Sequence, residues 1–201
     1  MCGIFGFWNF DGQLLDLPLL KRLNEQIRHR GPDDEGYYLW QDTAGDGNRG
    51  SLGLAHRRLA VLDLSSSGRQ PMSDESGMIW TVFNGEIFNF RELRKELEGK
   101  GYQFRSQTDT EVLIYAYQEW GIEAVSRLNG MFAIALWDTR TRKLYLVRDR
   151  LGVKPLYYYL DANRLIFASE LKPIMCFPGI DKAISEAGLA QYLMWQYICL
   201  L

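Results

Sequence analysis

The segment MCGIFGFWNF, residues 1–10, decides the fold because a cysteine stands directly before an apolar run. Residues 3–9 predict a buried strand, and such a strand would hold the N-terminus in place instead of letting it fray. If Met1 is removed, Cys2 carries a thiol with a reference pKa of about 8.5 and a free α-amine with a pKa of about 7.7–8.0. One residue can then act as nucleophile and base without a histidine. The alternative is that Cys2 is only a small apolar residue at a terminus.

Composition excludes several classes of protein. The 201 residues are 47% hydrophobic and 24% charged, which is enough for one large domain with a real core. The formal net charge is −2, and no basic excess marks a surface for nucleic acid. The longest uninterrupted apolar run, 131–137, is too short to span a bilayer. We therefore expect neither nucleic acid nor a membrane as a partner.

The cysteines indicate the redox compartment. The chain has three, Cys2, Cys176 and Cys199, with wide spacing and no Cys-x-x-Cys pair. This pattern predicts neither a disulfide framework nor a metal site. A reducing compartment fits best, so we expect a cytoplasmic protein.

Periodicity predicts a mixture of strands and helices. Expected strands cover residues 3–9, 36–42, 51–55, 79–83, 131–137, 144–147, 156–160 and 164–168. Expected helices cover 16 to about 30, 89–99 and 108–120, with weaker ones at 170–177 and 185–195. Because strands come early and late with helices grouped between them, antiparallel sheets are favoured over βαβ units.

Helix starts are marked by capping signals. Asp16 is a candidate N-cap for the first helix. Asn89 with Glu92, and Thr108 with Glu111, both fit the capping box that opens a helix.

Turn signals lie between the expected strands. Asp11-Gly12 is typical of a hairpin turn, and a Gly-rich turn is expected at 44–48. Asn84-Gly85 follows the strand expected at 79–83 and can be interpreted as a type I′ turn.

Several polar groups at strand ends and helix starts have both a structural and a chemical interpretation. Arg58 could form a surface ion pair, and Asp109 could complement a helix dipole. Together with Cys2 they are the kinds of group that hydrolysis of an amide in an amino-acid substrate requires. Amide hydrolysis by a thiol needs oxyanion donors, commonly a backbone N–H and an Asn side chain such as Asn84. An amino-acid substrate needs a guanidinium for its carboxylate and carboxylates for its ammonium, which Arg58 and Asp109 would supply.

The chain resembles the class II glutamine amidotransferase domain, in a form closest to the asparagine synthetase branch. The resemblance covers about residues 2–175. It is carried by MCGIFG (1–6), HRGPDDEG (29–36), AHRRLAVLDL (55–64), FNGEIFN (83–89), TDTEVL (108–113), LNGMFA (128–133), RDRLGVKPLYY (148–158) and FASELK (167–172).

The resemblance implies an α+β fold: a four-layer αββα sandwich of two antiparallel sheets flanked by helices, of the N-terminal-nucleophile hydrolase type. It also implies residue roles. Cys2, after loss of Met1, would be the nucleophile, and Asn84 and Gly85 would form the oxyanion hole. Glutamine would be bound by Arg58, Leu59, Val61, Leu62, Asn84, Gly85, Glu86 and Asp109.

Other polar residues are expected to be structural. If the α-amine serves as base, His29 and His56 support loops or the core. Residues 148–150 with Lys154 could be a phosphate cradle, but a structural ion-pair turn near the nucleophile strand is favoured.

Domain organisation follows from the same resemblance. We expect a glutaminase domain over 1–180, with 181–201 as a linker or the start of a truncated synthetase domain. The domain itself would need no metal or cofactor, whereas the synthetase domain would use ATP and Mg. The parent activity would be glutamine-hydrolysing asparagine synthase, with L-glutamine and a C-terminal synthetase domain or subunit as partners. A homodimer stays open.

Two alternatives stand beside an enzyme whose ammonia is used to amidate aspartate. The domain is catalytically silent, binding glutamine or serving structure alone, if Met1 is retained. It is an amidotransferase for another acceptor if the synthetase region differs.

Overall fold

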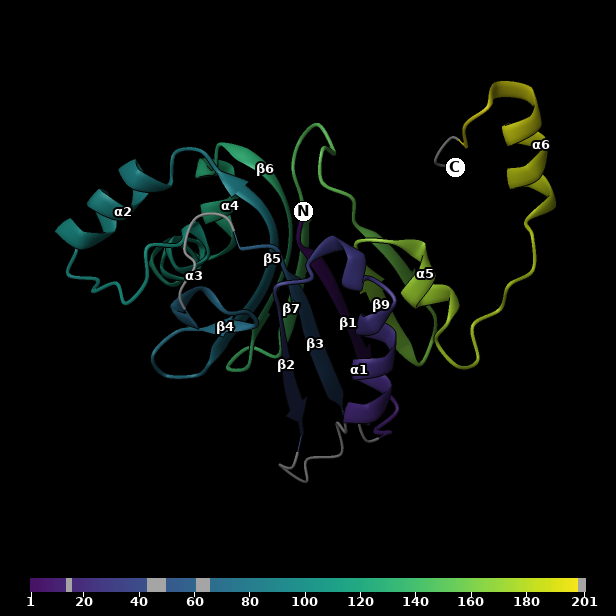
Figure 1. Ribbon diagram of the computed structural model, residues 1–201, viewed down its shortest axis with the longest axis horizontal. Helices are drawn as coiled ribbons and strands as arrows, with labels where there is room; N and C mark the ends of the chain where they lie inside the picture. Colours follow the sequence, from purple (N-terminus) through teal and green to yellow (C-terminus); the bar gives the residue numbers. More distant parts are fainter. Residues whose placement is uncertain (14–15, 43–49, 61–65, 199–201) are drawn as a thin grey trace.

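A computed structural model describes residues 1–13, 16–42, 50–60 and 66–198 and shows two stacked antiparallel sheets (Figure 1). The five-stranded sheet has the order β2 (Asp34–Gln41), β3 (Ser51–Arg58), β1 (Gly3–Asn9), β9 (Arg164–Ala168) and β8 (Tyr157–Leu160). The four-stranded sheet has the order β4 (Met72–Ser73), β5 (Ile79–Ile87), β6 (Gly130–Asp138) and β7 (Lys143–Arg148).

Helices cover the outer face of each sheet, which completes the expected αββα sandwich. The five-stranded sheet packs against α1 (Leu17–Glu25) and α5 (Leu171–Met175), with η1 (Arg28–Arg30) following α1. The four-stranded sheet packs against α2 (Phe90–Gly99), α3 (Asp109–Trp120) and α4 (Ala124–Arg127), with η3 (Gly121–Glu123) linking α3 to α4. The fold class predicted from the sequence is therefore confirmed.

Strand β1 shows why the first residues organise the fold. It lies between β3 and β9, and its side chains alternate between two cores. Phe5 and Phe7 pack under α1 and α5, whereas Ile4 packs between the sheets with Trp137 and Phe167. Both faces of β1 are buried, so the residue before Gly3 is held at one end of the sandwich.

The helix predictions are largely confirmed, but only one of the two expected capping boxes forms. Thr108 caps α3 by accepting a hydrogen bond from the Glu111 N–H. Asn89 occupies the N-cap position of α2 without capping it. Its side chain instead donates to the Arg127 carbonyl (3.0 Å) and accepts from the Asn129 N–H (2.9 Å).

The first helix also differs in detail from its signals. Asp16 is at the N-cap of α1 but makes no side-chain capping bond. The helix ends at Glu25, and the chain continues into η1.

Two turn predictions are wrong. Strand β1 pairs with β3 and β9, so Asp11-Gly12 leads toward α1 and does not close a hairpin. Asn84 and Gly85 lie inside β5, paired with Ala133 and Phe132 of β6, and are not a type I′ turn. The turn expected at 44–48 lies outside the described residues.

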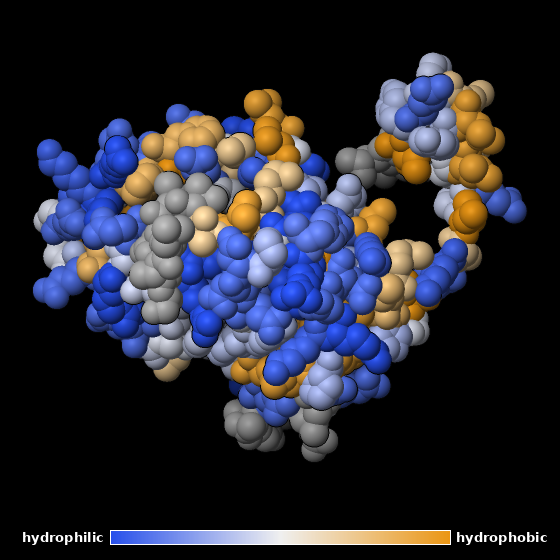
Figure 2. Space-filling view, in the orientation of Figure 1, coloured by the Kyte–Doolittle hydropathy of each residue, from blue (hydrophilic) through white to orange (hydrophobic). Residues whose placement is uncertain are grey.

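The last helix, α6 (Glu186–Trp195), stands apart from the sandwich (Figure 1). None of its residues is buried, and Leu193, Met194 and Trp195 are among its exposed apolar side chains (Figure 2). Among the described residues, no helix has the length and apolar character needed to cross a bilayer.

Candidate active site

Cys2 is fixed beside the end of strand β3. The register pairs Gly3 with Arg57, so the next position along brings Cys2 next to Arg58. The Cys2 Sγ atom accepts a hydrogen bond from the Leu59 N–H at 3.4 Å and lies 3.6 Å from the Leu59 carbonyl oxygen. The Cys2 carbonyl accepts a bond from Arg30 Nε at 3.0 Å. Both the backbone and the thiol are therefore held in place.

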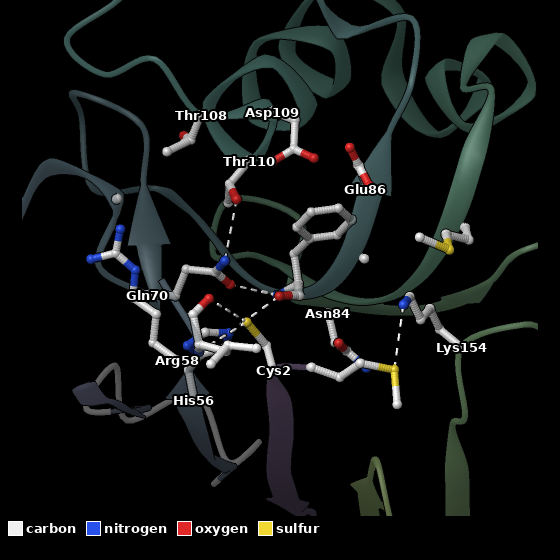
Figure 3. Close-up of a pocket in the computed structure, with 16 residues that line it drawn as sticks. Cys2, His56, Arg58, Gln70, Asn84, Glu86, Thr108, Asp109, Thr110 and Lys154 are labelled. Carbon is white, nitrogen blue, oxygen red and sulfur yellow. Dashed lines mark hydrogen bonds between the residues drawn. The ribbon is translucent and has the colours of Figure 1, made fainter. Parts of the chain in front are cut away.

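One pocket brings together the predicted residues that the structure describes (Figure 3). Its lining includes Cys2, Arg58, Leu59, Asn84, Gly85, Glu86 and Asp109. Cys2 directly precedes β1, Arg58 and Leu59 lie at the end of β3 and just after it, and the others come from β5 and the start of α3. Val61 and Leu62, predicted on the same grounds, lie outside the described residues, as does Cys199.

The edge of β5 presents hydrogen-bond donors to this pocket. The Phe88 N–H donates to the Asn129 carbonyl. In an antiparallel pair, every second residue directs its N–H to the neighbouring strand, so this bond shows which N–H groups of β5 point toward β6. The N–H groups of Phe83, Gly85 and Ile87 therefore point away from β6. Side chains accept from the outer two, and the Gly85 N–H lies between them at the pocket.

Asn84 adds a second donor. It is 1% exposed, and its Nδ2 has no hydrogen-bond partner among the described residues. A buried amide left without a partner costs free energy, and such groups are common where a ligand completes the site. Gly85 cannot be replaced freely, because a Cβ there would overlap the Met131 carbonyl oxygen.

Charges of opposite sign line the pocket. Arg58 is 8% exposed and Asp109 is 4% exposed. Burial raises the pKa of Asp109 to about 6, with a further rise from Glu86, although the N–H of Ile87 acts in the opposite direction. The Asp109 Oδ2 accepts that N–H at 3.0 Å. Because a guanidinium and carboxylates line one pocket, it matches a ligand that carries both charges.

The Cys2 thiol is also perturbed. Burial raises its pKa, and Asp109 raises it further. The Leu59 backbone, the terminal amine and the Arg58 guanidinium act in the opposite direction without cancelling the rise. With Met1 attached, the thiol is therefore largely protonated at neutral pH.

The two histidines occupy supporting positions, as the sequence predicted. Burial lowers the pKa of His56 to about 4, so its imidazole is neutral at pH 7. Its Nε2 lies 3.2 Å from the Phe83 carbonyl and donates to it. His29 lies at the surface, with Nε2 2.9 Å from Glu170 Oε1.

The segment 148–154 is a structural turn. The Asp149 carboxylate accepts the N–H groups of Phe132, Leu151, Val153 and Lys154. Arg148 and Arg150 donate to backbone carbonyls rather than to carboxylates, so the expected ion pairs are replaced by carbonyl contacts.

Several pocket residues were not identified from the sequence. Gly68, Gln70 and Thr110 line the pocket, and none carries a local signal of its own, because each reaches the pocket only through folding. Lys154, expected only in a structural turn, also lines the pocket, with Nζ 3.5 Å from Met1 Sδ. Gly68 is needed there, since a Cβ would overlap Arg58 Nη2.

The αββα fold is shared with a solved amidotransferase structure. It matches glutamine phosphoribosylpyrophosphate amidotransferase from B. subtilis with a TM-score of 0.69 and 22% identity, covering 86% of this chain and 43% of that one. A family model described as a glutamine amidotransferase domain matches residues 1–200, and the chain belongs to this family.

Curated relatives agree with the family. The chain is 41% identical to asparagine synthetase [glutamine-hydrolyzing] 1 of Bacillus subtilis over 98% of its own length and 30% of the relative's. It is 36% identical to amidase chry2 of Gibberella zeae over 88% of its length and 27% of that protein. The chain thus spans about a third of the length of these relatives.

Proposed function

We propose that this chain hydrolyses L-glutamine to glutamate and ammonia, with Cys2 as the nucleophile after Met1 is removed. The observation that carries the proposal is the convergence of a thiol, two amide donors, a guanidinium and carboxylates on one pocket. With Met1 attached, the amine of Cys2 is part of a peptide bond and cannot act as base. Removal of Met1 frees the base.

The roles follow from the charges and donors. The Arg58 guanidinium binds the substrate α-carboxylate, and Glu86 and Asp109 bind its ammonium. Leu59 lines the same pocket, and Val61 and Leu62 are proposed to contact glutamine on the sequence resemblance alone. These contacts direct the side-chain amide of glutamine toward Cys2.

The chemical steps balance on this chain's own groups. The α-amine takes the thiol proton, and the sulfur attacks the amide carbon. Asn84 Nδ2 and the Gly85 N–H stabilise the negative oxygen of the tetrahedral intermediate. The amine then gives its proton to the departing ammonia, leaving a γ-glutamyl thioester. Water, activated by the same amine, releases glutamate.

The test combines intact mass with turnover. Purified protein lacking the mass of Met1 should release glutamate from glutamine, and the Cys2→Ala variant should release none above background. Folding of the variant is checked by its thermal melting. Processed wild-type protein with no turnover above Cys2→Ala would refute the proposal.

We further propose that the ammonia serves an amide-forming synthetase region, as the name of the asparagine synthetase relative suggests. On the sequence resemblance alone, that region would use ATP and Mg. Residues 1–180 would be the glutaminase domain, and 181–201 would lead toward that region. A cytoplasmic location fits this metabolism.

Two other functions keep a specific basis. Retention of Met1 would give a silent glutamine-binding domain, and intact mass distinguishes it. The second candidate is an amidotransferase for an acceptor other than aspartate, because a relative with the same domain bears another name, amidase chry2.

A further inference from the structure

The peptide group of Phe83 is held on both sides by buried side chains. Strand β4 pairs with β5 only at Trp80 and Thr81, so β5 has no strand neighbour on this side at Phe83. The Phe83 N–H instead donates to Gln70 Oε1 at 2.6 Å, and its carbonyl accepts from His56 Nε2 at 3.2 Å. His56 is 1% exposed and Gln70 is 6% exposed, so water does not replace these bonds.

Each side chain ties Phe83 to a different part of the pocket. His56 lies on β3, opposite Ile4 of β1 and two residues before Arg58. Gln70 Nε2 donates to Thr110 Oγ1 at 3.2 Å, and Thr110 follows Asp109 at the start of α3.

Three separate segments of the pocket therefore meet at one peptide group. They carry the guanidinium of Arg58, the amide donors of Asn84 and Gly85, and the carboxylate of Asp109. The imidazole crosses from one sheet to the other, and the amide of Gln70 crosses from β5 to α3 (Figure 3). The bonds of this buried network hold it rigidly, because breaking one leaves a desolvated partner. The other imidazole nitrogen, His56 Nδ1, is buried without a partner among the described residues.

We propose that His56, Gln70 and Thr110 are positioning residues that fix Asn84 and Gly85 relative to the Cys2 thiol. This inference rests on the proposed glutaminase function. His56 acts as a neutral hydrogen-bond donor and takes no part in proton transfer. His56 contacts the carbonyl of Phe83, which directly precedes Asn84 and Gly85 on β5. A shift of the Phe83 peptide therefore moves both oxyanion donors. A displacement of about 1 Å in such a site can cost about a hundredfold in rate.

Matched variants separate positioning from folding. His56→Met keeps the size of the side chain and removes the donor, whereas His56→Gln keeps a terminal N–H near the position of Nε2. Thr110→Val removes the acceptor for Gln70, and Thr110→Ser keeps it. Thr81→Val is the control, because it removes a buried bond from the same strand, Oγ1 to the Ala135 carbonyl at 3.1 Å, away from the pocket.

Steady-state kinetics of processed protein give the first readout. We expect His56→Met to lower kcat at least about tenfold while the KM for glutamine changes less than about threefold, because oxyanion donors act in the transition state. His56→Gln and Thr110→Ser should stay within about threefold of wild type in kcat. Thr81→Val should lose thermal stability only. Equal kcat for His56→Met and wild type, or equal losses for His56→Met and His56→Gln, would overturn the inference.

Amide hydrogen exchange gives a readout that does not need turnover. The Phe83 amide, which donates to Gln70, should exchange at least about tenfold faster in His56→Met and Thr110→Val than in wild type. His56→Gln and Thr81→Val should leave its exchange unchanged. If wild type shows no turnover, the proposed function fails, and the exchange rates alone decide whether the positioning network exists. Unchanged exchange in both apolar variants would refute it.

Discussion

The Sγ atom of Cys2 accepts a hydrogen bond from the Leu59 backbone N–H at 3.4 Å. This contact and the Arg58 guanidinium lower the pKa of the thiol, but burial outweighs them and leaves the pKa raised. The thiol at the N-terminus is thus placed for attack yet kept protonated while Met1 is attached.

Alkylation should report this state. In the chain that carries Met1, we expect the rate of Cys2 alkylation by iodoacetamide to rise with pH. The midpoint of this rise should lie above the ordinary thiol pKa of about 8.5. Arg58→Met should move the midpoint higher, since a cation that favours the thiolate is lost. Peptide mapping by mass spectrometry gives the rate, and the exposed Cys176 serves as the internal control. A Cys2 midpoint below 8 would contradict the expected burial.

Titration of Asp109 should set the acidic limb of the pH–rate profile for glutamine hydrolysis. Because its pKa is raised to about 6, it becomes neutral as the pH falls through 6 and ceases to attract the substrate ammonium. We expect kcat/KM for glutamine to fall below about pH 6 and this inflection to vanish in Asp109→Asn, whose KM should be higher at pH 7. An unchanged inflection in the variant would assign it to another group.

The same carboxyl should cost stability at neutral pH. A folded pKa above the unfolded value of about 3.9 means that the folded state binds more protons between about pH 4 and 6, so stability falls as pH rises through that window. Asp109→Asn keeps an oxygen for the Ile87 N–H and removes the buried charge. We expect it to be more stable than wild type at pH 7, by up to about 3 kcal/mol, and no more stable at pH 4. Denaturant unfolding at both pH values tests this, and a less stable variant at pH 7 would be the contrary result.

Gly68 should control the position of the Arg58 guanidinium. A Cβ at Gly68 would overlap Arg58 Nη2, the far end of a flexible side chain, so the guanidinium moves while the fold is kept. We expect Gly68→Ala to raise the KM for glutamine at least about tenfold with little change in Tm. Gly99→Ala is the control, because nothing lies within 4 Å of its Cβ. Equal KM values for the two variants would show that Arg58 does not hold the substrate.

Asp149 should be among the most costly carboxylates to remove. Asp149→Ala leaves four backbone N–H groups without an acceptor, and we expect a loss of about 3 kcal/mol or more in the free energy of unfolding. Asp161→Ala, in an exposed turn where the carboxylate accepts two N–H groups, should lose less.

The pH dependence gives a second test of Asp149. Burial alone would raise its pKa, but the N–H bonds from Lys154, Val153, Phe132 and Leu151 lower it overall. Its contribution is therefore present above the ordinary value of about 3.9 and is lost as pH falls through the lowered pKa. Urea unfolding of wild type and Asp149→Asn should differ at pH 7 and converge toward pH 2.

The segment 181–201 should be dispensable for the sandwich. No residue of α6 is buried, whereas Phe177 and Ile180 pack with α1 and the five-stranded sheet. We expect a chain that ends at Ile180 to keep the Tm and the glutaminase rate of the full chain. A chain that ends at Met175 should melt lower, because Phe177 is lost from the core. A large drop in Tm for the first truncation would move the domain boundary.

Local patterns predicted the elements better than their ends. The apolar run of residues 3–9 was enough to identify β1, and strands were also expected where β6, β7, β8 and β9 lie. Asn84-Gly85 was ambiguous, because the same dipeptide suits a turn and a strand. The pairing with Ala133 and Phe132 of β6 decided it.

The two capping boxes show the same limit. Thr108 and Asn89 stand in similar local patterns, yet only Thr108 caps its helix. The Asn89 side chain bonds to Asn129 and Arg127 instead, which lie far along the chain. A partner brought near by folding outcompeted the local bond.

The sequence by itself determined the order of strands and helices, the kinds of polar groups available and the resemblance that names the family, because these depend on neighbours in the chain. Only the tertiary structure decided that Arg58, Asn84, Gly85 and Asp109 share a pocket with Cys2. It also decided that the Asp109 carboxyl and the Cys2 thiol have raised pKa values and that His56 supports Phe83. Burial and hydrogen bonding by residues from distant elements create these properties, and no local pattern specifies which residues those will be.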